Sequence, residues 1–207
     1  SLSHEVFMHV YDDNVDFDDV FNRVYNVYED KFEVKEKVWI RNIKKDLQLS
    51  FLTIRKHYLE YMDYQSYELE KKHIVALDEY TYLNGQFDKV IITSNYYVIV
   101  DYKTSNKYSF QPKYLDYGLS MQLPIYSLVV EDLYKDFDKK AFGFYYSCIL
   151  NPSLKLKISD FDSLCPSHLK LKGVSITDDT NIEEIDKTIS EGKSEFISGL
   201  KYVKKYN

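Results

Sequence analysis

Residues that break or crosslink a chain are scarce in this sequence. The 207 residues include six Gly, four Pro and two Cys, which excludes a collagen-like chain, a linker-dominated chain and a disulfide framework. No run of about 18 uncharged apolar residues occurs, so no transmembrane helix is predicted. A chain without expected disulfides suits a reducing compartment, and we expect the cytoplasm.

The sequence also lacks an initiating Met and a secretory signal, because it begins Ser-Leu-Ser-His-Glu. We therefore expect residues 1–207 to form a single domain excised from a longer protein. Hydrophobic residues make up 44% of the chain and charged residues 29%, which excludes wholesale disorder.

Positive charge is in short supply. The 27 basic and 33 acidic residues leave a net charge of −6, which argues against a protein that coats nucleic acid by bulk electrostatics. A site in which bound metal ions supply the positive charge is compatible with this balance. The 21 Tyr residues have two interpretations, a compositional bias or stacking platforms for unpaired bases.

Hydrophobic periodicity predicts helices first, then an antiparallel unit, a helix, a strand and closing helices. This order indicates an α/β fold with a mixed sheet. The helices are expected over residues 1–10, 20–28, 37–63, 112–135, 182–190 and 194–204. The strands are expected over residues 67–83, 86–103 and 141–150, with short ones at 169–171 and 174–176. On the long helix, Lys44, Lys45, Arg55 and Lys56 either form a solvated face or meet phosphates.

The segment 85–104 carries the chemistry. If Ser94 and Asn95 form a two-residue turn, paired residue numbers sum to 189 and Asp88 lies opposite Asp101. Lys103 follows Asp101 by two residues and leaves the same face. Two opposed carboxylates repel unless a cation lies between them, and oxygen ligands favour Mg²⁺ or Mn²⁺. The alternative is an Asp101–Lys103 ion pair at a strand end, with Asp88 merely exposed.

These residues resemble the core motif of the PD-(D/E)XK nuclease superfamily. Within it they are most like the RecB-type branch, and the C-terminal nuclease domain of AddB/RexB subunits in particular. The branch pattern is a Gly-x-x-Asp strand, an apolar strand ending Asp-Tyr-Lys-Thr, and a helix starting Gln-Leu-x-x-Tyr. The matching segments are Gly85–Asp88, Val100–Thr104 and Gln122–Tyr126. Here Asp101 itself fills the acidic position two residues before the lysine.

The resemblance implies a restriction-endonuclease-like core, with a mixed β-sheet flanked by α-helices, and assigns roles to individual residues. Lys103 would be the catalytic lysine, acting with Asp88 and Asp101, while Gln122 and Tyr126 would brace the site or touch the DNA backbone. The implied ligands of Mg²⁺ or Mn²⁺ are His4, Asp88, Asp101 and the backbone carbonyl of Tyr102. A Glu on the preceding strand would assist, either Glu68 or Glu70.

One departure concerns iron. Many members of the branch hold a four-iron cluster on four cysteines, and neither Cys148 nor Cys165 fits that spacing. No iron–sulfur cluster can be assembled from this chain alone.

By resemblance, we expect a metal-dependent deoxyribonuclease, an exonuclease, that serves a helicase–nuclease complex in double-strand-break repair and recombination. A helicase subunit or domain would deliver single-stranded DNA ends, and no membrane is involved. Two alternatives are a non-catalytic nucleic-acid-binding or scaffold domain with the nuclease fold, and a stand-alone CRISPR-associated exonuclease.

Overall fold

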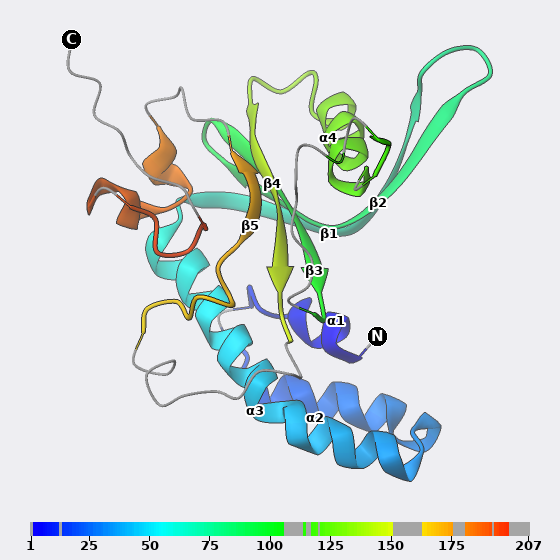
Figure 1. Cartoon of the computed structure of the whole chain (residues 1–207), viewed down its shortest axis with the longest axis vertical. Helices are drawn as coiled ribbons and strands as arrows, with labels where there is room; N and C mark the ends of the chain where they lie inside the picture. Colours follow the sequence, from blue (N-terminus) through cyan, green and yellow to red (C-terminus); the bar gives the residue numbers. More distant parts are fainter. Residues whose placement is uncertain are drawn as a thin grey trace.

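A five-stranded mixed sheet forms the centre of the computed structural model (Figure 1). The structure describes residues 2–12, 14–105, 114, 117–119, 121–150, 163–175, 181–191 and 193–198. The order of these five strands follows the chain, with β3 and β4 paired in parallel and the other neighbours paired antiparallel. The strands are β1 (Tyr64–Ala76), β2 (Tyr82–Thr93), β3 (Tyr96–Lys103), β4 (Lys140–Cys148) and β5 (Lys172–Ser175). The predicted α/β fold with a mixed sheet is confirmed.

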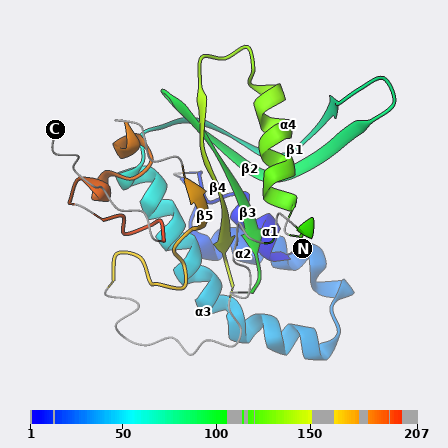
Figure 2. The same cartoon turned by 45° about the horizontal axis from the view of Figure 1, so that its top comes forward.

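Helices cover both faces of the sheet (Figure 2). One face packs against α1 (Leu2–Phe7), α2 (Phe17–Tyr28) and α3 (Val34–Lys56), and the other packs against α4 (Gln122–Leu133). Strand β3 alternates between the two cores: Val98 and Val100 face α1–α3, whereas Tyr97 and Ile99 face α4. A strand buried on both faces in this way reads as a continuous apolar run. In the part of the chain that the structure describes, no helix is long and apolar enough to cross a membrane.

Helix α3 is the predicted long helix. A capping box between Glu33 and Glu36 opens it, and a π-helical turn, His57–Tyr61, continues it. Of its basic residues, Arg55 donates hydrogen bonds to the carbonyls of Val10 (3.1 Å) and Val15 (2.7 Å). Arg55 therefore holds the chain after α1 in place and is not simply part of a solvated face.

The first predicted strand boundary is wrong. The turn lies at residues 77–81, because the Asp78 carboxylate accepts hydrogen bonds from the backbone N–H groups of Tyr80 and Thr81, both at 2.8 Å. Such an Asx turn competes successfully with a strand. Strand β2 therefore runs straight through Asn84 and Gly85.

Several helix boundaries also change. Helix α2 begins earlier than predicted, at Phe17, because Asp16 caps it by accepting from the Asp18 N–H at 2.7 Å. Helix α4 begins at Gln122, and residues 117–119, expected in this helix, are not α-helical. The other residues predicted before position 121 lie mostly outside the described part.

Near the C-terminus, the two predicted helices are wrong where the structure describes them. Residues 182–191 form two 3₁₀ turns, Ile182–Glu184 and Lys187–Glu191. The buried Asp186 carboxylate accepts from the N–H and hydroxyl of Thr188 and from the Ser194 hydroxyl. These local bonds replace a helical ladder. Residues 194–198 are likewise not helical, and residues 199–204 lie outside the described part.

The β4–β5 pair needs glycine for a close approach. A Cβ atom on Gly173 would lie 1.9 Å from the Phe144 carbonyl oxygen, and one on Gly143 would lie 2.2 Å from the Val174 carbonyl oxygen. Backbone atoms cannot yield that much space. The single strand β5 stands where the sequence predicted two short strands around Gly173.

Candidate active site

The hairpin that joins β2 and β3 has the predicted register. Lys89 pairs with Val100 and Ile92 with Tyr97, so the residue numbers sum to 189. The paired residues end at Lys89 and Val100. Beyond them the Asp88 carboxylate accepts a hydrogen bond from the backbone N–H of Tyr102 at 2.7 Å, a donor that would otherwise belong to the ladder. The expected pairing of Asp88 with Asp101 is therefore replaced by a side-chain contact one residue further along β3.

Side-chain alternation shifts in β2 at the same point. Phe87 and Val90 both pack in the core beneath α4, although residues three apart in a regular strand face opposite sides. Between them, Lys89 points to the other core, where it lies over Tyr11 and Tyr58. The shift turns Asp88 toward α1.

Three potential ligands meet there. The nitrogen and oxygen atoms that His4, Glu70 and Asp88 offer lie within 4.8 Å of one another, and we call this group the acidic cluster. His4 reaches it from α1, with Nδ1 3.3 Å from Glu70 Oε1 and Nε2 3.6 Å from Asp88 Oδ2. The predicted neighbourhood of His4 and Asp88 is present, and Asp101 lies outside this group of three.

Of the two candidate glutamates, Glu70 is the one that lies in the acidic cluster. Glu70 lies across from Asp88, because the flanking pairs are Leu69–Lys89 and Lys71–Phe87. Its backbone φ is +49°, a left-handed conformation that a residue with a Cβ adopts at a cost of about 1–3 kcal/mol. Glu68 instead forms an ion pair with Lys71 at 2.6 Å.

Asp101 and Lys103 form a second group, against α4. Lys103 Nζ lies 2.5 Å from Asp101 Oδ2, a buried oxygen, so the two side chains form a close ion pair. Gln122, the first residue of α4, donates to Asp101 Oδ1 at 2.8 Å and to the Tyr126 hydroxyl at 3.1 Å, and it accepts from Lys103 Nζ at 3.1 Å. Gln122 therefore orients both charged groups at once.

The two groups interact electrostatically. The pKa of Asp88 is raised to about 6, first by burial and then by the charges of Asp101 and Glu70, while His4 and the Tyr102 N–H act in the opposite direction. Burial likewise raises the pKa of Asp101, while its hydrogen bond to Lys103 lowers it. Concentrated negative charge at a partly buried place favours a bound cation.

Tyr102 contributes in two ways. Its backbone N–H holds Asp88, and its buried ring stands edge-on to His4, with ring centroids 5.9 Å apart. The ring hydroxyl accepts a hydrogen bond from Lys89 at 3.2 Å. The role of its carbonyl as a ligand stays a prediction.

Sequence reasoning missed Lys89. This side chain is fully buried, 3.8 Å from the ring centroids of both Tyr11 and Tyr58, and burial holds its pKa well below the usual range. No carboxylate pairs with it among the residues that the structure describes. The sequence signal for this buried lysine was its position next to the apolar residues that lead to Ile92. Part of the high tyrosine content is explained by Tyr11, Tyr58 and Tyr102, which surround the Lys89 amine.

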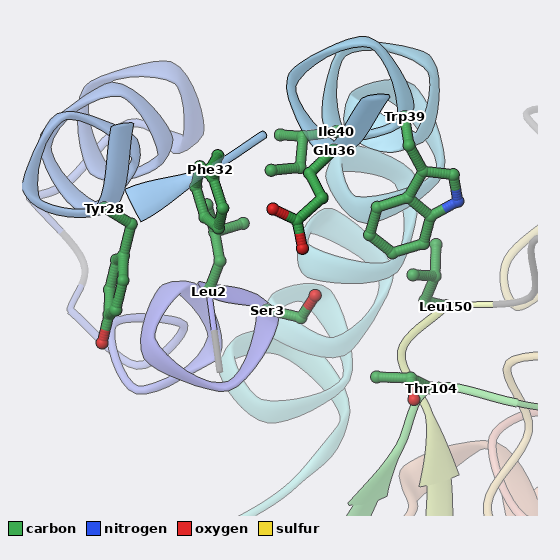
Figure 3. A pocket seen from close by; sticks show the side chains of 9 residues that line it. All are labelled: Leu2, Ser3, Tyr28, Phe32, Glu36, Trp39, Ile40, Thr104 and Leu150. Carbon is green, nitrogen blue, oxygen red and sulfur yellow. The ribbon is translucent and has the colours of Figure 1, made fainter. Parts of the chain in front are cut away.

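Two cavities adjoin the acidic cluster. One of about 290 Å³ opens on His4 and Glu70 and is lined also by Tyr28. A larger, mainly apolar pocket of about 450 Å³ lies beside it, between α1 and α3, and shares Tyr28 with the first (Figure 3). Its polar groups are few, Glu36 among them, so the larger pocket is not where a cation would bind.

The two cysteines stand apart from the acidic cluster. Cys148 and Cys165 are both free and buried, and burial raises the pKa of the Cys165 thiol to about 12. Cys165 belongs to a small separate core with Leu169 and Phe196.

Comparison with known proteins places these features in a family. The chain is 29% identical over 137 residues to a subunit of the ATP-dependent helicase/deoxyribonuclease of Limosilactobacillus reuteri strain DSM 20016, and equally to the same subunit from L. reuteri subsp. reuteri strain JCM 1112. Each match covers 61% of this chain and 11% of the relative's length. The family match extends over residues 1–202, and the chain belongs to the PD-(D/E)XK nuclease superfamily.

Proposed function

We propose that this domain is a divalent-metal-dependent deoxyribonuclease that hydrolyses DNA phosphodiester bonds, with exonuclease action at a single-stranded end. The observation that carries the proposal is the electrostatic interaction of the acidic cluster with Asp101, the partner of Lys103, at the ends of β2 and β3. Phosphodiester hydrolysis needs charge neutralisation and a positioned nucleophile more than covalent chemistry.

The residues fit a hard divalent cation such as Mg²⁺ or Mn²⁺. They offer carboxylate oxygens from Glu70, Asp88 and Asp101 and a histidine nitrogen from His4, which is a ligand set that Mn²⁺ accepts and that Mg²⁺ accepts through its oxygens. Asp101 Oδ2 is buried and already holds the positive charge of Lys103 at 2.5 Å, so a cation could take this place if the Lys103 amine moved aside. A bound cation would supply an activated water and neutralise charge on the phosphate.

Three further side chains, those of Lys103, Gln122 and Tyr126, would assist the reaction. Lys103 holds its ammonium group against Asp101 in a partly buried position, where it can stabilise negative charge that develops on a phosphate oxygen. Gln122 fixes the direction of the Lys103 amine and the rotation of the Asp101 carboxylate. Tyr126 supports Gln122 from one helical turn further along α4.

The names of the relatives support a cellular setting. Their names describe subunits of an ATP-dependent helicase/deoxyribonuclease, and we propose that this domain acts with a helicase partner that delivers DNA ends for repair by recombination. An acidic domain has little electrostatic affinity for DNA of its own, which suits delivery by a partner.

Cleavage of end-labelled DNA tests the proposal. Single- and double-stranded oligonucleotides are incubated with the domain in Mg²⁺, Mn²⁺ or chelator, and we expect cleavage from a single-stranded end that stops completely in chelator. Cleavage that persists in chelator, or its absence with both metals while the domain is folded, would reject the proposal and favour a non-catalytic nucleic-acid-binding or scaffold domain.

A further inference from the structure

The hairpin of β1 and β2 projects beyond the rest of the sheet as a two-stranded arm (Figure 1, Figure 2). The arm comprises the paired residues outward of Glu70 and Asp88, from Lys71–Phe87 to Ala76–Tyr82. Its root is therefore the acidic cluster itself. At 3.3 Å per residue, the six steps along β2 from Asp88 to Tyr82 span about 20 Å.

One face of the arm is covered by α4. Val75, Leu83 and Phe87 pack into the core beneath α4, and a Cβ atom on Gly85 would meet the Val129 side chain at 3.1 Å. His73 adds a 3.1 Å contact with Asp132 of α4. Contacts with α4 therefore cover this face of the arm.

The opposite face is exposed along its whole length and is continuous with the acidic cluster. Gln86 donates a hydrogen bond to Glu70 Oε2 at 2.9 Å, which fixes Gln86 on the cluster's side. The outward pairs on this side are Lys72–Gln86, Ile74–Asn84 and Ala76–Tyr82, and all six of these residues are exposed. Tyr82 is 61% exposed and Ile74 60%.

The chemistry of this exposed face suits a single-stranded polynucleotide. Lys72 supplies a cation, Gln86 and Asn84 supply amide donors, and Tyr82 offers an aromatic face of the kind on which unpaired bases stack. Between Glu70 and the tip no carboxylate lies on this face, so phosphates meet no like charge until Asp78 and Glu79. These two acidic residues at the tip would mark the outer end of the surface available to phosphates.

We propose that the exposed face of the arm binds the single strand whose scissile phosphate lies at the acidic cluster, with a phosphate at Lys72 and a base stacked on Tyr82. This inference rests on the proposed function, since it extends the substrate outward from the same site. It gives the chain a binding surface in spite of its overall negative charge.

Strand binding tests the inference directly. The affinity of the domain for a fluorescein-labelled oligothymidylate is measured by anisotropy in Ca²⁺ at several salt concentrations. We expect Tyr82→Ala to weaken binding about fivefold or more, as loss of one base–aromatic stack predicts. We expect Lys72→Gln to weaken binding and to reduce the slope of log K against log salt by about 0.7, the value for one phosphate contact on a single strand.

Two matched variants control for nonspecific effects. Tyr80→Ala removes a tyrosine that is 88% exposed at the acidic tip, and Lys35→Gln removes an exposed lysine on α3; neither should change the affinity. Unchanged binding in both Tyr82→Ala and Lys72→Gln, or equal losses in the controls, would overturn the inference and leave this face for a protein partner.

Parallel cleavage assays of the unmodified domain separate the two proposals. Binding lost in the variants without metal-dependent cleavage rejects only the nuclease function, and cleavage without loss of binding rejects only the arm.

Discussion

Replacing Lys103 by glutamine is expected to lower the rate constant of metal-dependent DNA cleavage by about 10² to 10³-fold, the usual cost of removing one donor that stabilises developing charge. Lys103 is the positive group closest to the buried Asp101 carboxylate, at 2.5 Å. Glutamine keeps much of the side-chain length and removes the charge. The measurement is kcat for a single-stranded oligonucleotide at saturating Mg²⁺.

Lys35→Gln is the matched control for this prediction, because it makes the same chemical change on an exposed part of α3 and should leave kcat unchanged. Thermal unfolding of both variants establishes that they are folded. A Lys103→Gln domain that cleaves at the unmodified rate would remove this lysine from the mechanism.

Replacing Asp88 by asparagine is expected to abolish cleavage and, at the same time, to stabilise the metal-free domain. A variant that loses a direct ligand should lose at least about 100-fold in activity, since loss of a partner of a ligand alone costs about 10–100-fold. Asparagine can still accept the hydrogen bond from the Tyr102 N–H, which the Asp88 carboxylate accepts at 2.7 Å. It no longer places a charge beside Asp101 and Glu70.

The sign of the stability change follows from the pKa. In the folded, metal-free domain the pKa of Asp88 is raised to about 6, so the native state binds more protons than the unfolded state between about pH 4 and 6. Stability therefore falls as the pH rises through this window, and the cost persists above it. At 1.36 kcal/mol per unit, a shift of about two units corresponds to an upper limit of about 3 kcal/mol.

Urea denaturation in chelator measures this effect. Asp88→Asn should raise the free energy of unfolding by about 1–3 kcal/mol at pH 8 and by little at pH 4, where the carboxyl group is already protonated. The matched control is Asp136→Asn, which changes an exposed aspartate after α4 and should show no such pH dependence. A destabilised Asp88→Asn domain at pH 8 would contradict the charge crowding inferred for the metal-free site.

Much of the site could be predicted because it lies on one hairpin. The Ser94-Asn95 turn fixes the register of β2 and β3, and a register once fixed determines which residues meet. The position of Gln122 at the start of α4, where it reaches both Asp101 and Lys103, was expected only from the family resemblance, because the periodicity predicted a helix from residue 112. The contact between His4 and Asp88, far apart in sequence, was expected only from the family resemblance.

The remainder depends on tertiary contacts that no local pattern records. The left-handed backbone at Glu70 and the shift in alternation near Asp88 are not anticipated by strict strand alternation. These local changes accompany the approach of Glu70 and Asp88 to His4, whereas Glu68 lies outside the acidic cluster. Near the C-terminus, the sequence pattern predicted a helix over residues 182–190, but the buried Asp186 carboxylate accepts local hydrogen bonds that stabilise 3₁₀ turns instead.

A crystal of the domain soaked in Mn²⁺, with the anomalous signal of manganese recorded, tests the central claim most directly. We expect an anomalous peak bonded to carboxylate oxygens of both Asp88 and Asp101, with His4 beside it and the Lys103 amine displaced from its close pairing with Asp101. Manganese bound only elsewhere on the surface, or Asp88 and Asp101 too far apart to share the ion in the soaked crystal, would contradict it.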